Sequence, residues 1–232
     1  MTVPHVTPEQ KRRSLLTPEP VFTAVQAGVE VQRRFLFLQR LFFSLAVLVG
    51  LGSMWVVPSV LSGIFSNTHW IAFGGALLCF AVTLIVRRRY SGTIQTLFFY
   101  LGFLGLGAGV GYAFGPNNRM ALMNMTILVG SAMLGGLLNA AVTTRRAPSP
   151  YREFLLTGPW LLAGVAVAFV FFPAGEWALL VSGIAALVIL FFIHQATLES
   201  LERFTPREAL VAAADIIPIT VLSTWRRVSG EA

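Results

Sequence analysis

The sequence predicts an all-α polytopic membrane protein with seven transmembrane helices, the C-terminal one enclosed by the other six. Of its 232 residues, 56% are hydrophobic, and its mean hydropathy is +0.74. Only 12% of the residues are charged, roughly half the share found in an average soluble domain. Apolar runs of about 20 residues, long enough to cross a bilayer as helices, recur along the chain.

Six of these runs are the predicted transmembrane helices. Pro58 is expected to kink the far end of the first, which begins at Phe35 or at Leu41. Residues 1–34 are interpreted as a cytoplasmic tail and residues 35–232 as the membrane domain, because no apolar signal-peptide core follows the basic residues near the N-terminus. The approximate ranges are 35–65, 70–86, 93–114, 120–143, 154–172 and 177–197.

The basic residues predict the orientation of these helices. The tail and the loops on its side carry 14 of the 17 Lys and Arg residues, whereas the opposite loops carry Arg119 alone. Because cytoplasmic loops are enriched in Lys and Arg, the N-terminus is predicted to be cytoplasmic. The net charge of +7 follows from these clusters at the ends of the apolar runs, so nucleic acid is not an expected partner.

The seventh apolar segment, 209–225, is shorter than the others. Its apolar part has about 15 residues, roughly 22 Å of helix against a hydrocarbon core of about 30 Å. If this segment crosses the membrane, Arg226 and Arg227 lie outside, against the charge rule. It either crosses fully or enters the membrane and returns; we favour a crossing, because a helix surrounded by protein need not match the lipid thickness.

Asp215, in the middle of this segment, is the main candidate for a functional residue. It is the only aspartate in the chain, and apolar residues flank it on both sides. An ionisable side chain at membrane depth is costly and faces protein or trapped water. Its carboxylate needs a cation or hydrogen-bond donors, and Arg87 is the proposed partner. Asp215 is then either a permanent latch between helices or a switch that responds to pH or ions.

His194, Gln195 and Glu199, near the end of the sixth run, are predicted to be gate or ion-linked residues together with Asp215 and Arg87; the alternative is an interfacial polar cluster at a helix end. A metal site would need several such ligands to converge, so no metal is expected. No Ser-His-Asp or His-Glu-x-x-His pattern is evident, and we therefore expect neither a catalytic residue nor a cofactor.

Small residues in the third and fourth runs predict close helix packing. At a spacing of four residues they form small-xxx-small faces, at which helix backbones approach each other. A glycine-rich nucleotide loop would need a preceding strand instead. The residues are Gly105, Gly107, Gly109 and Gly111 in the third run, and Ser131, Gly135 and Gly136 in the fourth.

Three motifs together resemble the Bax inhibitor family, also called the transmembrane Bax inhibitor motif family, in its bacterial branch. The stretch 209–217, Ala-Leu-Val-Ala-Ala-Ala-Asp-Ile-Ile, resembles the family signature Ala-Leu-x-Leu-Tyr-Leu-Asp-x-Ile-Asn-Leu-Phe. The turn 143–146, Thr-Thr-Arg-Arg, resembles the Thr-Lys-Arg-Asp break between the fourth and fifth helices. The three arginines 87–89 after the second run also fit, and the resemblance extends from about Arg33 to the end.

The resemblance implies six helices around a seventh and a bacterial inner membrane location. It also implies a proton-sensitive calcium leak gated by two aspartates and an arginine, of which Asp215 and Arg87 match the second aspartate and the arginine. Where the family has its first aspartate, residues 193–197 read Ile-His-Gln-Ala-Thr, and Pro218 replaces the family's asparagine. The missing carboxylate favours a second interpretation, a non-conducting protein that binds another membrane protein, such as a modulator of a quality-control protease.

Overall fold

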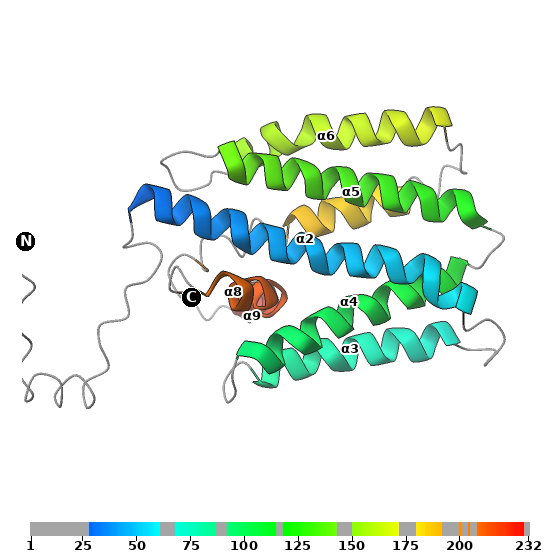
Figure 1. Ribbon diagram of the computed structural model, residues 1–232, viewed down its shortest axis with the longest axis horizontal. Helices are drawn as coiled ribbons and strands as arrows, with labels where there is room; N and C mark the ends of the chain where they lie inside the picture. Colours follow the sequence, from blue (N-terminus) through cyan, green and yellow to red (C-terminus); the bar gives the residue numbers. More distant parts are fainter. Residues whose placement is uncertain are drawn as a thin grey trace, which may run out of the picture.

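The computed structural model describes residues 28–60, 68–86, 92–114, 118–142, 150–171, 180–191, 200, 204 and 208–229, and every element in these ranges is a helix (Figure 1). The helices are α2 (Val29–Val60), α3 (Thr68–Val86), α4 (Gly92–Phe114), α5 (Arg119–Val142), α6 (Pro150–Phe171), Leu180–Phe191, α8 (Ala209–Ala214) and α9 (Ile216–Ser229). The all-helical prediction is therefore confirmed for this part of the chain.

Four of these helices are long and apolar enough to cross a membrane. They are α2 from Glu30 onward, α3, α4, and α5 as far as Ala140. Helices α3, α4 and α5 begin and end within two residues of the ranges expected from the sequence. The apolar helices Thr157–Phe171 and Leu180–Phe191 are shorter in their described part, so seven crossings stay a prediction.

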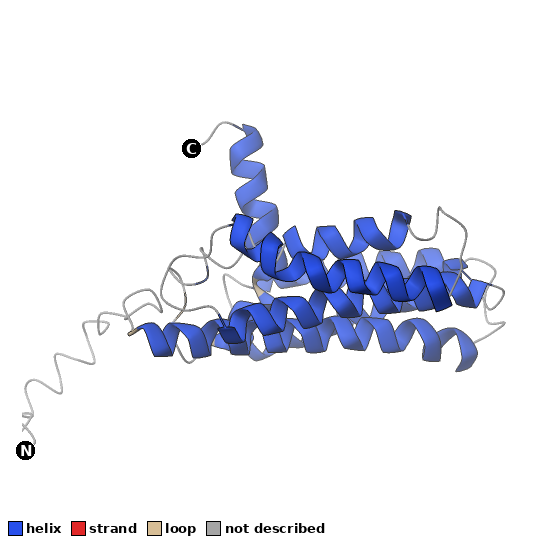
Figure 2. Cartoon of the chain, turned by 90° about the horizontal axis from the view of Figure 1, so that it is seen from above, coloured by secondary structure: helices blue, strands red, loops and turns tan. Residues whose placement is uncertain are grey.

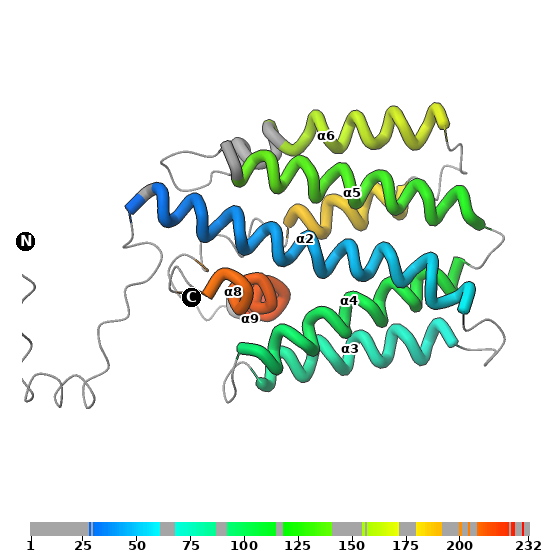
Figure 3. Tube along the Cα trace, viewed as in Figure 1, coloured from blue at the N-terminus to red at the C-terminus, as the bar shows by residue number. Residues whose placement is uncertain are grey.

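The long helices lie side by side and alternate in direction (Figures 1 and 3). Helix α2 lies between α4 and α5, α3 packs on α4, and α6 packs on α5. Helix Leu180–Phe191 contacts α5, where Ala186 joins Leu128 and Ala132 in a buried cluster. We call the end of the bundle at which α2 begins the basal end, and the other the distal end.

Helix α2 begins earlier than expected. The sequence prediction placed its start at Phe35 or Leu41, but the structure has it at Val29. Glu30 lies in its first turn, where a negative charge is favourable, and Arg33 and Arg34 are good helix formers. The predicted boundary between tail and membrane domain, residue 34, therefore lies inside a helix.

The glycines of α4 allow close helix packing, as the sequence predicted, and the structure shows that the neighbours are α2 and α3. A Cβ atom added to Gly107 would clash with the carbonyl oxygen of Gly50 in α2, and one added to Gly111 would clash with that of Met54. On another face of α4, a Cβ on Gly109 would lie 2.7 Å from the ring of Phe73 in α3. The small-xxx-small faces thus allow α4 to pack closely against two neighbours.

Helix α5 uses small residues in the same way against α6. A Cβ on Gly135 would lie 2.9 Å from Thr157, and one on Gly164 would lie 2.5 Å from the Ser131 hydroxyl. Gly136 differs from its prediction: among the described residues, no atom of a neighbouring helix lies within 4 Å of a Cβ built on it. It contributes its carbonyl oxygen to a buried hydrogen bond instead, which is described below.

The outward surface of the bundle is apolar. Leu77 in α3 and Leu162 in α6 are 72% and 70% exposed, and Leu78, Ile85 and Phe169 are exposed as well. Soluble proteins rarely present such continuous apolar faces to water. These helices fit a lipid environment.

Candidate functional site

The C-terminal segment forms two helices, not the single enclosed helix expected from the sequence. Helix α8 ends at Ala214, Asp215 lies at the turn, and α9 begins at Ile216. Figure 2 shows α9 lying across the long axis of the bundle and reaching out past the other helices. Burial extends through Thr220, whereas Val221 and Trp225 are 44% and 67% exposed. The prediction of a C-terminal helix enclosed along its length is therefore wrong for the outer part of α9.

Pro218 gives the physical reason for the change in direction. A proline lacks the N–H that would donate to the carbonyl of the residue four positions earlier, which is Ala214, and its ring clashes with that carbonyl. Kinks in helices commonly have this cause. The neighbouring bonds persist: the Asp215 N–H donates to the Val211 carbonyl at 3.0 Å, and the Ile219 N–H donates to the Asp215 carbonyl at 2.8 Å. The chain therefore bends at Asp215 without losing its helical hydrogen bonds on either side.

Small side chains allow α8 to enter the bundle. Ala212, Ala213 and Ala214 are 0–1% exposed, and α8 contacts both α2 and α4. Ala212 packs in a cluster with Phe35 and Leu36 of α2. Three consecutive alanines present little bulk, so α8 packs on both helices at once and carries Asp215 with it.

Asp215 is completely buried. The Gln95 side-chain amide of α4 donates a hydrogen bond to its Oδ1 atom at 3.1 Å. Desolvating a carboxylate is expensive unless hydrogen bonds compensate, and an amide N–H is a suitable donor. Arg87, the partner that the sequence suggested, lies outside the described residues.

A second glutamine binds the segment one turn before Asp215. The Gln39 side-chain amide of α2 donates to the Ala212 carbonyl at 3.2 Å and to the Ser200 hydroxyl at 2.8 Å. The adjacent Arg40, only 4% exposed, donates from Nη1 to the Gly136 carbonyl of α5 at 3.0 Å. Side chains from α2 and α4 thus connect the C-terminal segment and α5 through buried polar bonds.

These groups form a layer, which we call the polar layer. Twenty helical residues span about 30 Å, the thickness of the hydrocarbon core. Twenty residues counted from the distal ends of α2, α4 and α5 end at about Leu41, Gln95 and Leu138, respectively. The polar layer therefore lies at the basal boundary of the hydrocarbon core. Its buried members are Gln39, Arg40, Gln95, Asn139, Ser200 and Asp215.

An aromatic cluster covers the polar layer on its distal side. Phe99 contacts Phe103 and Phe43, with ring centroids 5.1 Å and 6.0 Å away, and Phe43 meets Phe103 edge-on at 5.7 Å. Ile216 and Ile219 of α9 belong to the same buried cluster. The residues that follow Asp215 therefore pack directly against this aromatic cluster.

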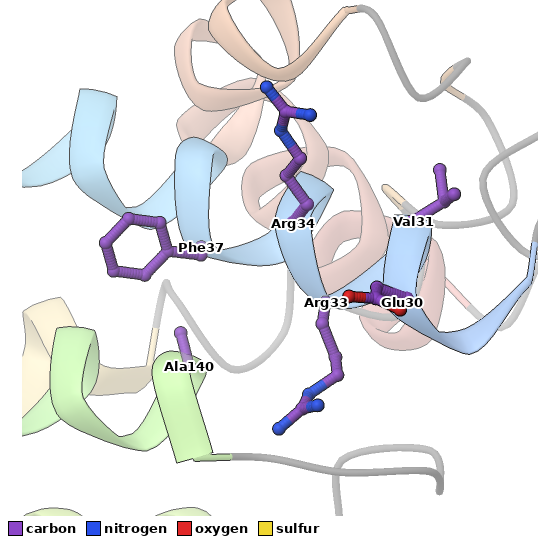
Figure 4. A pocket seen from close by; sticks show the side chains of 6 residues that line it. All are labelled: Glu30, Val31, Arg33, Arg34, Phe37 and Ala140. Carbon is purple, nitrogen blue, oxygen red and sulfur yellow. The ribbon is translucent and has the colours of Figure 1, made fainter.

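A pocket opens at the basal end between α2 and α5 (Figure 4). Its volume is about 630 Å³. Figure 4 shows the Arg33 side chain extending past Ala140, while that of Arg34 points the opposite way. Asp215 does not line this pocket, so the two features are separate. The lining residues are Glu30, Val31, Arg33, Arg34, Phe37 and Ala140.

Among the residues predicted to form a site, the structure places Asp215 alone. Arg87, His194, Gln195 and Glu199 lie outside the described residues. Within the described ranges, no group of three or more His, Cys, Asp or Glu residues is positioned to hold a metal ion.

Gln39 and Gln95 were not predicted from the sequence, and Arg40 was counted only among the basic residues that predict the orientation. The signal was present, because a polar residue about 20 positions from the other end of an apolar run marks the membrane boundary. The partners of these residues lie 96 to 173 positions away in the chain. The sequence alone therefore could not join them.

No protein-family model, curated protein or solved structure matches the chain. Membership of the Bax inhibitor family therefore stays a prediction that rests on the three motifs quoted above.

Proposed function

We propose that this protein is an integral membrane protein of Bax-inhibitor type that forms a proton-sensitive cation leak, with Asp215 at its gate. In this proposal it lies in the bacterial inner membrane with the basal end in the cytoplasm. The observation that carries the proposal is a fully buried carboxylate, bonded to Gln95, at a bend in the C-terminal segment. An ionisable residue buried inside a bundle of membrane helices marks an ion or proton pathway by default, and transporters place such sites at discontinuous helices.

Protonation of Asp215 would change the hydrogen bonds that hold the bend. The ionised carboxylate is an acceptor only, which suits the Gln95 amide, whereas the protonated carboxyl also carries a donor. Asp215 is directly followed by Ile216, which packs in the aromatic cluster. A proton gained or lost at Asp215 can therefore bias the position of α9's first turn.

The described conformation corresponds to a closed gate in this proposal. Phe43, Phe99 and Phe103 fill the space distal to the polar layer, and hydrophobic constrictions of this kind close pores by excluding water. Conduction then requires that Ile216 and Ile219 withdraw from the aromatic cluster. The proposed permeant ions are calcium or protons.

The test is ion flux into liposomes that contain the purified protein, measured from about pH 6 to pH 8. Asp215→Asn keeps the size and acceptor of the side chain but cannot ionise. We expect a pH-dependent calcium flux for the wild type and a pH-independent flux for Asp215→Asn. Glu30→Gln, which removes an exposed carboxylate at the basal end, is the matched control and should keep the wild-type profile.

A latch would give a different result. In that case Asp215→Asn would lower the stability of the bundle and leave any basal flux unchanged. Flux no higher than that of empty liposomes, from protein shown to be folded, would overturn the leak.

The second candidate function is a non-conducting protein that binds another membrane protein. The basal pocket favours it, because Arg33 and Arg34 line it together with Phe37 and Ala140, and their positive charges would suit an acidic segment of a partner at the membrane surface. Arg33→Gln with Arg34→Gln should then abolish co-purification of that partner, while Asp215→Asn should not. Retention of the partner by the arginine variant would exclude the pocket as its binding site.

A further inference from the structure

We propose that α9 is an interfacial helix that binds anionic lipid head groups at the basal surface of the membrane and keeps the C-terminus on the basal side. The inference concerns a lipid-binding segment and does not depend on ion conduction. It rests on the depth, direction, burial and amphipathic pattern of α9.

The depth follows from the polar layer. Asp215, the residue before α9, is bonded to Gln95 in the first turn of α4. Residues closer to the start of α8 lie further toward the basal surface, since a Cβ on Gly92, the first residue of α4, would clash with Val211. Helix α9 therefore starts at the boundary between hydrocarbon and head groups.

The direction of α9 keeps it there. The long helices define the bundle axis, and Figure 2 shows α9 lying across this axis and extending sideways beyond the neighbouring helices. A helix of 14 residues is about 21 Å long. Because α9 runs across the axis of the crossing helices, this length lies along the membrane surface and not through it.

The sequence of α9 beyond its buried first turn is amphipathic. Val221 and Trp225, four residues apart, lie on one helix face, and both are exposed. The same segment carries two adjacent arginines in its sequence. Interfacial helices have an apolar face that enters the acyl boundary and a basic face that meets lipid phosphates.

Exposure and charge indicate that α9 contacts lipid. Trp225 is 67% exposed. Tryptophan is enriched at the membrane–water interface, which is the depth at which α9 lies. Arg226 and Arg227 follow directly, and basic residues close to the cytoplasmic leaflet attract anionic lipids. With α9 along the surface, both arginines stay on the basal side together with Arg33 and Arg34 at the start of α2. A crossing by this segment would place Arg226 and Arg227 outside, against the charge rule, whereas a position along the surface does not.

The first experiment locates the C-terminus. In a Cys79→Ser background, Ser229→Cys at the end of α9 and Met120→Cys at the distal end each provide one exposed thiol. A membrane-impermeant maleimide applied to sealed vesicles should label the two variants from opposite sides. Labelling of both from the same side would mean that α9 crosses the membrane and would overturn the proposal. This readout needs no flux, so its failure is distinct from failure of the proposed gate.

The second experiment tests the lipid. A fluorophore on Thr224→Cys, an exposed position in α9, is quenched by brominated lipid in vesicles of phosphatidylcholine with one quarter phosphatidylglycerol. We expect brominated phosphatidylglycerol to be enriched about tenfold around the probe, and the enrichment to fall with rising salt.

Charge variants complete the test. Arg226→Gln with Arg227→Gln should remove the enrichment, whereas Arg119→Gln, which removes a positive charge at the exposed distal end of α5, should preserve it. Equal quenching by both brominated lipids in the wild type, or an enrichment that survives loss of Arg226 and Arg227, would refute recognition of anionic lipid by α9.

Discussion

Helices α8 and α9 are consecutive parts of one apolar segment, yet they have opposite environments. The alanines of α8 are buried against α2 and α4, whereas the outer residues of α9 are exposed and amphipathic. Both are apolar enough to leave water. Side-chain size and a single proline separate them: alanine allows α8 to pack on protein, and Pro218 turns the bulkier α9 away.

The largest expected effect is from bulk added to α8. Ala213→Leu places three extra carbons at a site that is 1% exposed, and overpacking of a buried site costs about 1 to 3 kcal/mol. Val221→Leu adds a single carbon in α9, where the residue is 44% exposed, and should change stability by less than about 0.5 kcal/mol. Unfolding in mixed micelles measures both, and equal losses would contradict the division into a protein-packed and a lipid-packed helix.

Loss of the hydrogen bond at the bend should have the next largest effect. Gln95→Leu leaves the Asp215 carboxylate without the donor at 3.1 Å, and an unsatisfied buried polar group costs about 1 to 3 kcal/mol. Adding Asp215→Leu should recover part of this loss, because both partners are then apolar.

A double-mutant cycle in the same unfolding assay provides the control. We expect a coupling of at least about 0.5 kcal/mol between Gln95 and Asp215, as for residues in one hydrogen-bond network. Strictly additive losses would show that the Gln95 amide does not stabilise the carboxylate.

Pro218→Ala tests the cause of the bend and should have a moderate effect. The new N–H can donate to the Ala214 carbonyl, so part of the population should straighten. The distance between spin labels at Ser229→Cys and Met120→Cys should gain a component that is shorter by on the order of 10 Å, because a straight α9 would point toward the distal end. Pro159→Ala in α6 is the matched control. An unchanged distribution for Pro218→Ala would mean that packing of Ile216 and Ile219 sets the bend.

The smallest effect is expected at Trp225. It is 67% exposed in the structure and contributes to the lipid contact of α9, not to the core. Trp225→Ala should leave the free energy of unfolding of the bundle within about 0.5 kcal/mol of wild type. A loss comparable to that of Ala213→Leu would show that α9 packs on protein along its whole length.

The sequence alone determined the helical class, the bounds of α3, α4 and α5, and the small-residue faces of α4. Hydrophobic run length and small-residue spacing are local properties, so no knowledge of neighbouring segments is needed to read them. The importance of Asp215 was also visible, because a lone carboxyl group in an apolar segment is costly in any fold.

Only the tertiary structure decided the partner of Asp215 and the direction of α9. Gln95 lies 120 positions away from Asp215, and nothing local to either residue indicates their pairing. A proline such as Pro218 interrupts a helix locally, but the direction that the chain takes after it depends on what fills the space ahead. Here the aromatic rings of Phe43, Phe99 and Phe103 occupy the bundle core, and α9 therefore turns across the bundle and leaves it at the membrane boundary.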